Sequence, residues 1–220
     1  MSDLGLAIEK LPEVKAIIFD LDHTLHEGYI AASIYRGIMH KPKMATKATL
    51  GVFRGAIPAL FTWAGKAERV KKLIDSVSNW SKIPKPLAFM IVEARIRTKP
   101  VHESRKLLEA AQRSGVPVFL MTNGPDIGPL IYSRIYNIRD WIANPVVYDG
   151  QSIKGFDLVV RPKNISQKVT RLLAIHDLRP QDCMVVADNS YYLPLMEAAK
   201  FSVASPFAKG AMKRTADFRL

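Results

Sequence analysis

The sequence predicts an α/β fold in which a parallel sheet carries helices on both faces and one helical block is inserted. Three features of the chain support this prediction. Short apolar runs that end at polar residues alternate with amphipathic helical patterns, as they do in parallel sheets. The alternation stops between residues 26 and 99, where prolines divide the chain. A chain of 220 residues that is 48% hydrophobic can bury one core and a small insertion.

The expected core elements follow one another along the chain. They are a strand at 14–19, a helix at about 103–114 closed by Gly115, a strand at 116–121, a helix at about 127–136, a helix at 165–176, a strand at 183–187 and a late strand at 201–204. A β-hairpin is expected at 146–155, because Asp149-Gly150 favours a tight turn between short apolar runs. We therefore expect residues 1–25 and 100–220 to form the core domain and residues 26–99 to form a helical cap domain.

The first expected strand ends at two acids. Asp20 and Asp22 directly follow the apolar run at 14–19, and the alternation of side chains along a strand sends both to the same side. In open α/β sheets the carboxyl edge of the strands is where ligands bind. Two carboxylates this close repel each other unless a cation or a proton lies between them. The pair therefore indicates a functional site.

Polar residues follow two later strands as well. Thr122-Asn123-Gly124 ends the strand at 116–121, and Asp188-Asn189 ends the strand at 183–187. Lys163 lies ahead of the helix at 165–176, 25 positions before Asp188, and Lys168 inside that helix is the alternative to it. With the two acids of the first strand, these residues form an ordered series across about 170 positions.

This series resembles the motifs of the haloacid dehalogenase (HAD) superfamily, whose first motif matches the residues Asp-Leu-Asp-His-Thr-Leu at 20–25. The segment from Ala143 to Gly155 is similar to the phosphoserine-phosphatase-like branch of that superfamily. The resemblance implies a Rossmann-like doubly wound core with a helical cap inserted after the first motif. It also implies a Mg²⁺-dependent phosphatase that hydrolyses a phosphorylated small molecule.

The resemblance also implies roles for individual residues. Asp20 would be the nucleophile that forms an aspartyl-phosphate, and Asp22 would be the general acid and then the general base. Thr122, Asn123 and Lys163 would bind the phosphoryl oxygens of the substrate.

The metal site implied by the resemblance contains one departure. Mg²⁺ would bind Asp20, the backbone carbonyl of Asp22 and Asp188, because this hard cation prefers oxygen ligands. The branch usually carries a second acid four residues after the first, and here that position is Tyr192. Asn189 resembles a metal ligand of the carboxyl-terminal-domain phosphatases of the superfamily and would replace the missing acid. Without that replacement, the chain would be a weakly active or inactive enzyme.

The expected cap is strongly basic. It holds fourteen Lys and Arg against four Asp and Glu, which accounts for ten of the twelve net positive charges of the chain. This charge predicts either a solvated surface or the binding of an anionic partner, namely an anionic substrate, an anionic lipid surface or a nucleic acid. Leu50 to Ala64 has helical apolar spacing and is too short to span a bilayer, so it would pack within the cap or lie on a lipid surface. Tyr29 occupies the position of a cap acid in the branch, which argues against phosphoserine as the substrate.

Two classes of function therefore remain open from the sequence. One is a phosphomonoester hydrolase, and the other is a weakly active or inactive HAD-fold binding module that uses its basic cap on RNA or anionic lipid. The single cysteine, Cys183, excludes an internal disulfide framework and favours a reducing compartment. The amino-terminal residues do not resemble a secretory signal. We expect a cytoplasmic protein, which would be peripheral at a membrane if the cap binds lipid.

Overall fold

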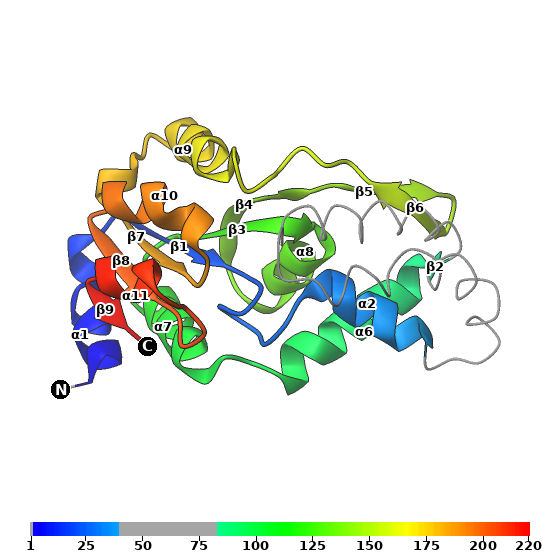
Figure 1. Cartoon of the computed structure of the whole chain (residues 1–220), viewed down its shortest axis with the longest axis horizontal. Helices are drawn as coiled ribbons and strands as arrows, with labels where there is room; N and C mark the ends of the chain where they lie inside the picture. The colour runs from blue at the N-terminus through cyan, green and yellow to red at the C-terminus, as the bar shows by residue number, and fades with distance from the viewer. Residues whose placement is uncertain (1, 40–82) are drawn as a thin grey trace.

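The computed structural model describes residues 2–39 and 83–220. In this part of the chain the central sheet has six strands, all parallel, in the order β4-β3-β1-β7-β8-β9 (Figure 1). The strands are β1 (Ala16–Asp20), β3 (Val118–Pro125), β4 (Ile138–Asn144), β7 (Cys183–Ala187), β8 (Phe201–Ala204) and β9 (Phe218–Arg219). The parallel α/β core predicted from the sequence is confirmed.

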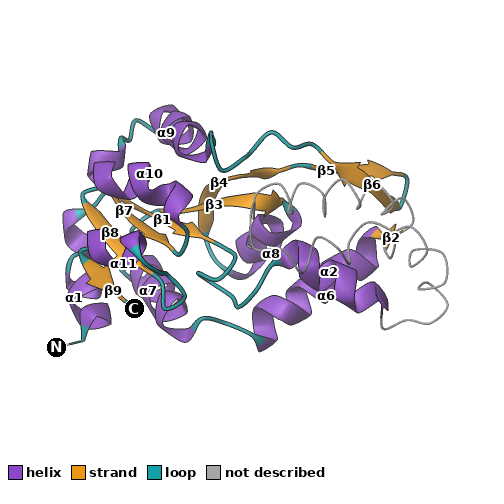
Figure 2. Ribbon diagram, in the orientation of Figure 1, coloured by secondary structure: helices purple, strands orange, loops and turns teal. Residues whose placement is uncertain are grey.

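Helices cover both faces of this sheet (Figure 2). One face packs against α1 (Asp3–Glu9), α7 (His102–Arg113) and α8 (Ile127–Ile135). The other packs against α9 (Ile165–Ile175), α10 (Leu193–Ala198) and α11 (Ala211–Thr215). Short 3-10 turns at Leu11–Glu13, Pro180–Asp182 and Ser190–Tyr192 connect these elements. The arrangement is doubly wound, as the sequence predicts.

Strand β1 lies at the centre of the sheet and is buried on both faces. Ile17 and Phe19 belong to the apolar cluster under α1 and α7, whereas Ala16 and Ile18 belong to the cluster under α9 and α10. All five residues of the strand are buried, which explains why the sequence shows a continuous apolar run here rather than an alternating one. The strand ends at Asp20, so this carboxylate stands at the carboxyl edge of the sheet.

Two helices mark the ends of the expected cap. Helix α2 (Ile30–Met39) packs against α6 (Lys85–Thr98), and α6 packs against α8 of the core (Figure 1). The expected helix at 50–64 and nine of the fourteen cap cations fall within residues 40–82 and lie outside the described residues. Within the described residues, no helix is both long enough and apolar enough to cross a membrane.

A second, antiparallel sheet pairs a strand of the expected cap with a hairpin of the expected core. Its strands β2 (Ile83–Pro84), β6 (Ser152–Phe156) and β5 (Val146–Asp149) lie in the order β2-β6-β5. The hairpin β5–β6 confirms the prediction for residues 146–155, and Gly150 in its turn has φ of +56°. The pairing of Ile83 with Ile153 is a long-range contact that the sequence pattern did not indicate.

Among the differences from the sequence prediction, two concern strands β4 and β3. Strand β4 was not predicted, because Arg139 and Asp140 interrupt its apolar pattern at the edge of the sheet. Strand β3 runs on to Pro125, so that Thr122, Asn123 and Gly124 lie within the strand rather than after it. Both differences concern the end of the sheet that carries the polar motifs.

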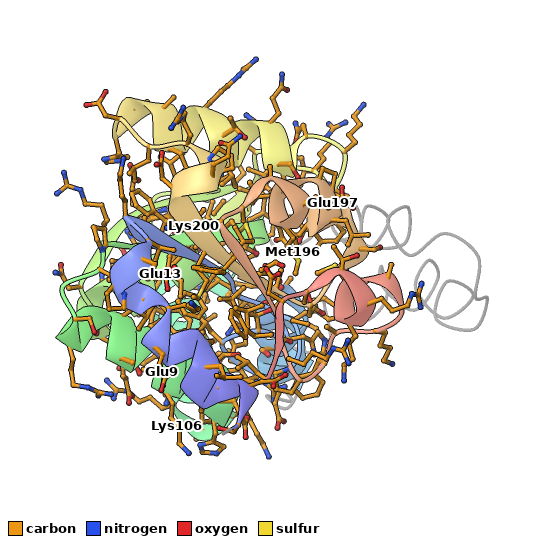
Figure 3. The ribbon with its side chains drawn as sticks, turned by 90° about the vertical axis from the view of Figure 1, so that its left-hand side faces the viewer. Glu9, Glu13, Lys106, Met196, Glu197 and Lys200 are labelled. Atoms are coloured by element: carbon orange, nitrogen blue, oxygen red, sulfur yellow. The ribbon has the colours of Figure 1, made fainter. Side chains whose placement is uncertain are left out.

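The amino-terminal edge of the sheet faces away from those motifs. Glu13 and Lys200 lie next to each other there (Figure 3), and the Lys200 ammonium donates to the backbone oxygen of Glu13 at 2.6 Å. A cavity of about 520 Å³ opens at the same edge and is lined in part by Lys15, Arg139 and His176. Among the described residues that line this cavity, none is a predicted site residue. The predicted acids instead lie at the carboxyl edge, where β1 ends at Asp20 and β7 ends just before Asp188.

Candidate active site

Asp20 is the most deeply buried acid of the candidate site. Its side chain ends β1, and the residue is only 2% exposed. The phenol of Tyr192, which is fully buried in the 3-10 turn after β7, donates a hydrogen bond of 2.7 Å to Oδ1 of Asp20. Burial and the charge of Asp20 both raise the pKa of Tyr192, so this phenol stays protonated and acts as the donor. One oxygen of the predicted nucleophile is therefore held in place.

The pKa of Asp20 is raised well above its ordinary value. Burial is the largest cause, followed by the negative charges of Asp188 and Asp22, while the hydrogen bond from Tyr192 acts in the opposite direction. The three carboxylates from β1, its following loop and the end of β7 thus form one electrostatic group, as the sequence predicts. A cation bound among them would relieve the repulsion and restore the ionised form of Asp20.

The two oxygens of Asp22 have different surroundings. The backbone amide of Ile30 donates to Oδ1 at 3.1 Å, and the Nε2 atom of His26 lies 3.1 Å from the same oxygen. The other oxygen, Oδ2, faces β3, because it lies 3.5 Å from the position that a Cβ would occupy on Gly124. The fold therefore fixes Oδ1 and turns Oδ2 toward the strand that carries Thr122.

His26 connects Asp22 to the core and was not identified from the sequence. The ring is fully buried, and its Nδ1 atom lies 3.3 Å from the hydroxyl of Tyr132 on α8. Oδ1 of Asp22 accepts from the Ile30 amide, so Nε2 of His26 acts as a second donor to this oxygen, and Nδ1 can then accept from the Tyr132 hydroxyl. His26 follows Asp22 by four residues, and this spacing is the one signal in the sequence that could have identified it.

The end of β3 brings the second motif to the acids. Thr122 is buried, and its Oγ1 accepts a hydrogen bond of 2.9 Å from the amide of Gly124. A Cβ on Gly124 would lie 3.1 Å from that oxygen, which is tighter than ordinary packing allows, so glycine suits this position. The backbone oxygen of Asn123 accepts from the side chain of Asn144 at 2.7 Å. This strand end is therefore fixed by hydrogen bonds on both sides.

Asn144 also ties β4 to the segment that leads to Lys163. The side chain of Asn144 donates to the backbone oxygen of Val160 at 3.0 Å and accepts from its amide at 2.7 Å. Lys163 lies on the surface just before α9, whereas Lys168 is half-buried within that helix. Which of the two lysines serves the site stays a prediction.

The fourth motif follows β7. Asp188 is half-buried and acts electrostatically on Asp20, and Asn189 is half-buried beside it. The backbone oxygen of Asn189 accepts from the amide of Tyr192 at 3.0 Å, which closes the 3-10 turn and directs the phenol toward Asp20. At the position where the resemblance calls for a second acid, the structure thus places a neutral hydrogen-bond donor on the predicted nucleophile.

The acids of this site could bind a hard divalent cation such as Mg²⁺ only if a backbone oxygen serves as a further ligand. Among residues 2–39 and 83–220, no three His, Cys, Asp or Glu side chains are grouped closely enough to hold a metal ion. The carboxylate of Asp22 is already engaged through Oδ1. A site made of Asp20, Asp188 and the backbone oxygen of Asp22 needs no third acidic side chain, and its oxygen donors suit a hard cation.

Several solved structures with a similar fold are named as phosphatases or hydrolases. An apo phosphoserine phosphatase superposes with a TM-score of 0.68 at 17% sequence identity, over 94% of this chain and 93% of that one. A HAD family hydrolase from Salmonella enterica serovar Typhi gives 0.65 at 16% identity, over 95% and 68% of the two chains. A cytosolic 5′-nucleotidase IIIB bound to cytidine gives 0.61 at 12% identity, over 99% and 83%. No protein-family model and no curated protein matches the sequence.

The similarities to the phosphoserine phosphatase and to the 5′-nucleotidase extend over 94% and 99% of this chain. The chain has the fold of the phosphoserine phosphatases and other hydrolases of the HAD superfamily.

Proposed function

We propose that this protein is a Mg²⁺-dependent phosphomonoesterase that works through an aspartyl-phosphate on Asp20. The observation that supports the proposal best is the meeting of Asp20, Asp22 and Asp188 beside Thr122, at the carboxyl ends of three adjacent strands. A binding module has no need for a buried carboxylate at Asp20 beside a second carboxylate, Asp22, whose Oδ2 faces the strand of Thr122. Among the solved structures with this fold are several named as phosphoserine phosphatases and one named as a cytosolic 5′-nucleotidase.

In the first step, an oxygen of Asp20 attacks the phosphorus atom of the ester. The bond between this oxygen and phosphorus forms while the bond from phosphorus to the alcohol oxygen breaks. The hydrogen bond from Tyr192 keeps the carboxylate in one orientation, which reduces the reorganisation needed for attack. Asp22 donates a proton from Oδ2 to the departing alcohol oxygen.

In the second step, the same oxygen of Asp22 acts as a base. It takes a proton from a water molecule that attacks the phosphorus, which releases inorganic phosphate and regenerates Asp20. The bonds that Oδ1 of Asp22 makes to Ile30 and His26 hold the carboxylate in place for both proton transfers.

The phosphoryl oxygens would be bound from β3 and from the segment before α9. The hydroxyl of Thr122, the backbone around Asn123 and the ammonium of Lys163 would stabilise the charge that spreads over them. A bound Mg²⁺ would neutralise further phosphoryl charge, with Asp20, Asp188, the Asp22 carbonyl and, in place of the missing acid, Asn189 as its ligands.

The cap of residues 26–99 would close over this edge and contact the alcohol part of a phosphorylated small molecule. Helix α2 begins at Ile30, whose amide binds Asp22, so the base of the cap is attached directly to the general acid. The alternative role of the cap in binding RNA or anionic lipid has no specific support among the described cations. Arg95 donates to the backbone oxygen of Glu27, and Arg97 pairs with Glu93.

Turnover measurements on a panel of phosphorylated metabolites, with and without Mg²⁺, test the proposal. Hydrolysis that requires Mg²⁺ and disappears in Asp20→Asn is expected, because an amide is not a competent nucleophile. Asp149→Asn, a matched change in the exposed hairpin turn, should keep full turnover. Wild-type activity in Asp20→Asn would refute the assignment of the nucleophile.

A further inference from the structure

Three aromatic side chains from two loops contact one another near the candidate site. The ring of Tyr29 meets the ring of His23 edge-on with centroids 4.8 Å apart, and the centroid of the Phe207 ring lies 5.4 Å from that of His23. Tyr29 is 49% exposed and Phe207 is 41% exposed, whereas most large apolar side chains of the described residues are buried. We call these three side chains the aromatic row.

Hydrogen bonds hold the row in place. The amide of Gly28 donates to Nδ1 of His23 at 3.3 Å, which makes this nitrogen an acceptor and leaves the ring faces without a charge. The buried hydroxyl of Ser205 donates to the backbone oxygen of His23 at 2.8 Å and accepts from the amide of Phe207 at 3.2 Å. His23 itself has φ of +61°, in the left-handed region that few residues other than glycine adopt. The row is therefore built by the backbone and is not a chance contact of mobile side chains.

The row is attached to the segment that carries and positions Asp22. His23 directly follows Asp22, and Tyr29 directly precedes Ile30, whose amide binds the carboxylate of Asp22. Burial and then the negative charges of Asp188, Asp22 and Asp20 raise the pKa of Tyr29, so its ring lies within the electrostatic reach of the acids. Because Asp22 protonates the leaving oxygen in the proposed mechanism, we expect the carbon skeleton attached to that oxygen to lie near these rings. Exposed aromatic rings stack on other flat rings, and such pairs contribute about 0.5–1.5 kcal/mol beyond the burial of their area.

We propose that the aromatic row selects phosphate monoesters whose alcohol part carries an aromatic or heteroaromatic ring. The ring of the substrate would lie against Tyr29 and Phe207 while the phosphoryl group lies at Asp20. This inference rests on the proposed function, which places the phosphoryl group and the leaving oxygen. The feature common to such substrates is a planar ring one or a few bonds from the ester oxygen. Both a nucleobase and a simple aryl group provide such a ring.

Binding of two non-hydrolysable ligands tests the proposal without any need for turnover. Benzylphosphonate and cyclohexylmethylphosphonate carry the same charge and similar bulk but differ in aromaticity, and isothermal titration calorimetry gives their dissociation constants in the presence of Mg²⁺. We expect wild-type protein to bind the benzyl compound about three- to tenfold more tightly, the range for one aromatic contact. The preference should fall toward onefold in Tyr29→Leu and in Phe207→Leu.

Phe201→Leu is the matched control, because Phe201 begins β8 at the opposite edge of the sheet. It should keep the wild-type preference, and circular dichroism checks that all three variants fold. Equal affinity for both ligands in the wild type, no binding of either, or a preference that survives in both Tyr29→Leu and Phe207→Leu would overturn the inference.

Turnover measurements distinguish a nucleobase from a simple aryl group as the ring of the substrate. They also distinguish a failure of the aromatic row from a failure of the proposed phosphatase activity. One measurement is the ratio of kcat/KM for a nucleoside 5′-monophosphate to kcat/KM for ribose 5-phosphate. If this ratio falls toward one in Tyr29→Leu, the ring is a nucleobase. A collapse confined to benzyl phosphate over cyclohexylmethyl phosphate identifies a simple aryl group. Hydrolysis of all esters with ratios near one contradicts the aromatic row but not the phosphatase, whereas ring-selective binding without hydrolysis contradicts the phosphatase alone.

Discussion

The hydroxyl of Tyr192 donates a hydrogen bond of 2.7 Å to Oδ1 of Asp20, although the two residues lie 172 positions apart. The proteins that the sequence resembles usually carry an acid at the position of Tyr192. An acid there would add negative charge to a group of carboxylates that already repel one another, whereas the phenol adds a donor and no charge. The substitution therefore changes the electrostatics of the predicted nucleophile and does more than remove a metal ligand.

Tyr192→Phe should raise the pKa of Asp20 further, because the hydrogen bond from the phenol acts to lower it. We expect the acidic limb of the pH profile of kcat/KM to move to higher pH, together with a loss of stability of about 1–3 kcal/mol at neutral pH, since Oδ1 of Asp20 loses its buried donor. Tyr148→Phe is the control, because its buried hydroxyl has no hydrogen-bond partner among the described residues, and it should leave the profile unchanged. An acidic limb that stays in place in Tyr192→Phe would show that the bond does not tune Asp20.

The raised pKa of Asp20 also makes the stability of the metal-free protein depend on pH. A carboxyl whose pKa is higher in the folded than in the unfolded protein contributes stability that is complete below its unfolded pKa and is lost as the pH rises through its folded pKa. Asp20→Asn removes this loss and keeps an acceptor for Tyr192. In EDTA, urea denaturation should show Asp20→Asn to be more stable than the wild type at neutral pH, with a gain that shrinks toward pH 4.

The same measurement on Asp149→Asn gives the baseline, because that carboxyl is exposed in the hairpin turn. If the stability difference between Asp20→Asn and the wild type were the same at every pH, Asp20 would have an ordinary pKa in the folded protein.

Asp22→Asn should lose most of its turnover on esters with poor leaving groups. Its loss of turnover on aryl esters should be much smaller. General acid catalysis contributes typically about 10²–10⁴-fold, and it matters most when the departing oxygen is basic. Measuring kcat on an alkyl and an aryl phosphate gives the two losses. Equal losses on both esters would argue against the assignment of Asp22 as the acid.

His26→Leu should give the same dependence on the leaving group in a weaker form, because Oδ1 of Asp22 loses one of its two bonding partners. His26→Gln is the matched variant, since its side-chain amide can still donate to that oxygen, and we expect it to recover part of the loss on alkyl esters. If the leucine and glutamine variants behaved alike on both esters, His26 would serve only to fill the core.

The proposed metal site can be tested at two of its ligands. Asp188→Ala should sharply raise the Mg²⁺ concentration needed for activity and reduce the thermal stabilisation by Mg²⁺, because a charged oxygen ligand is lost. Asn189→Ala should have a smaller effect in the same direction if Asn189 replaces the missing acid. Mg²⁺ titrations followed by melting temperature measure both changes, and a wild-type response in Asp188→Ala would contradict the proposed metal site.

The central strands and the acids could be predicted from the sequence because both follow from one local pattern. β1 and β7 are buried on both faces, so each appears as a continuous apolar run, and a parallel sheet brings their polar ends to one edge. The positions of Asp20, Asp22 and Asp188 therefore required no knowledge of long-range contacts.

The features that the sequence did not predict depend on contacts between distant residues. His26 meets Tyr132 across 106 positions, and neither residue belongs to a motif. Strand β4 lies at the sheet edge, where exposed polar residues interrupt the apolar pattern. Tyr192 could be recognised as a missing acid, but its role as a donor to Asp20 depends on the 3-10 turn that directs its ring inward.

The most direct test of the phosphatase mechanism is detection of the covalent intermediate. The protein is mixed with Mg²⁺ and an intact ester that it hydrolyses, and the reaction is quenched in acid during turnover. The protein is then digested, and mass spectrometry identifies the peptides that carry a phosphoryl group. The account predicts an acid-stable, base-labile phosphoryl group on the peptide that contains Asp20, increased in Asp22→Asn if loss of the base slows the second step, and absent in Asp20→Asn. Continued hydrolysis by Asp20→Asn, or a phosphoryl group found on a different residue, would contradict it.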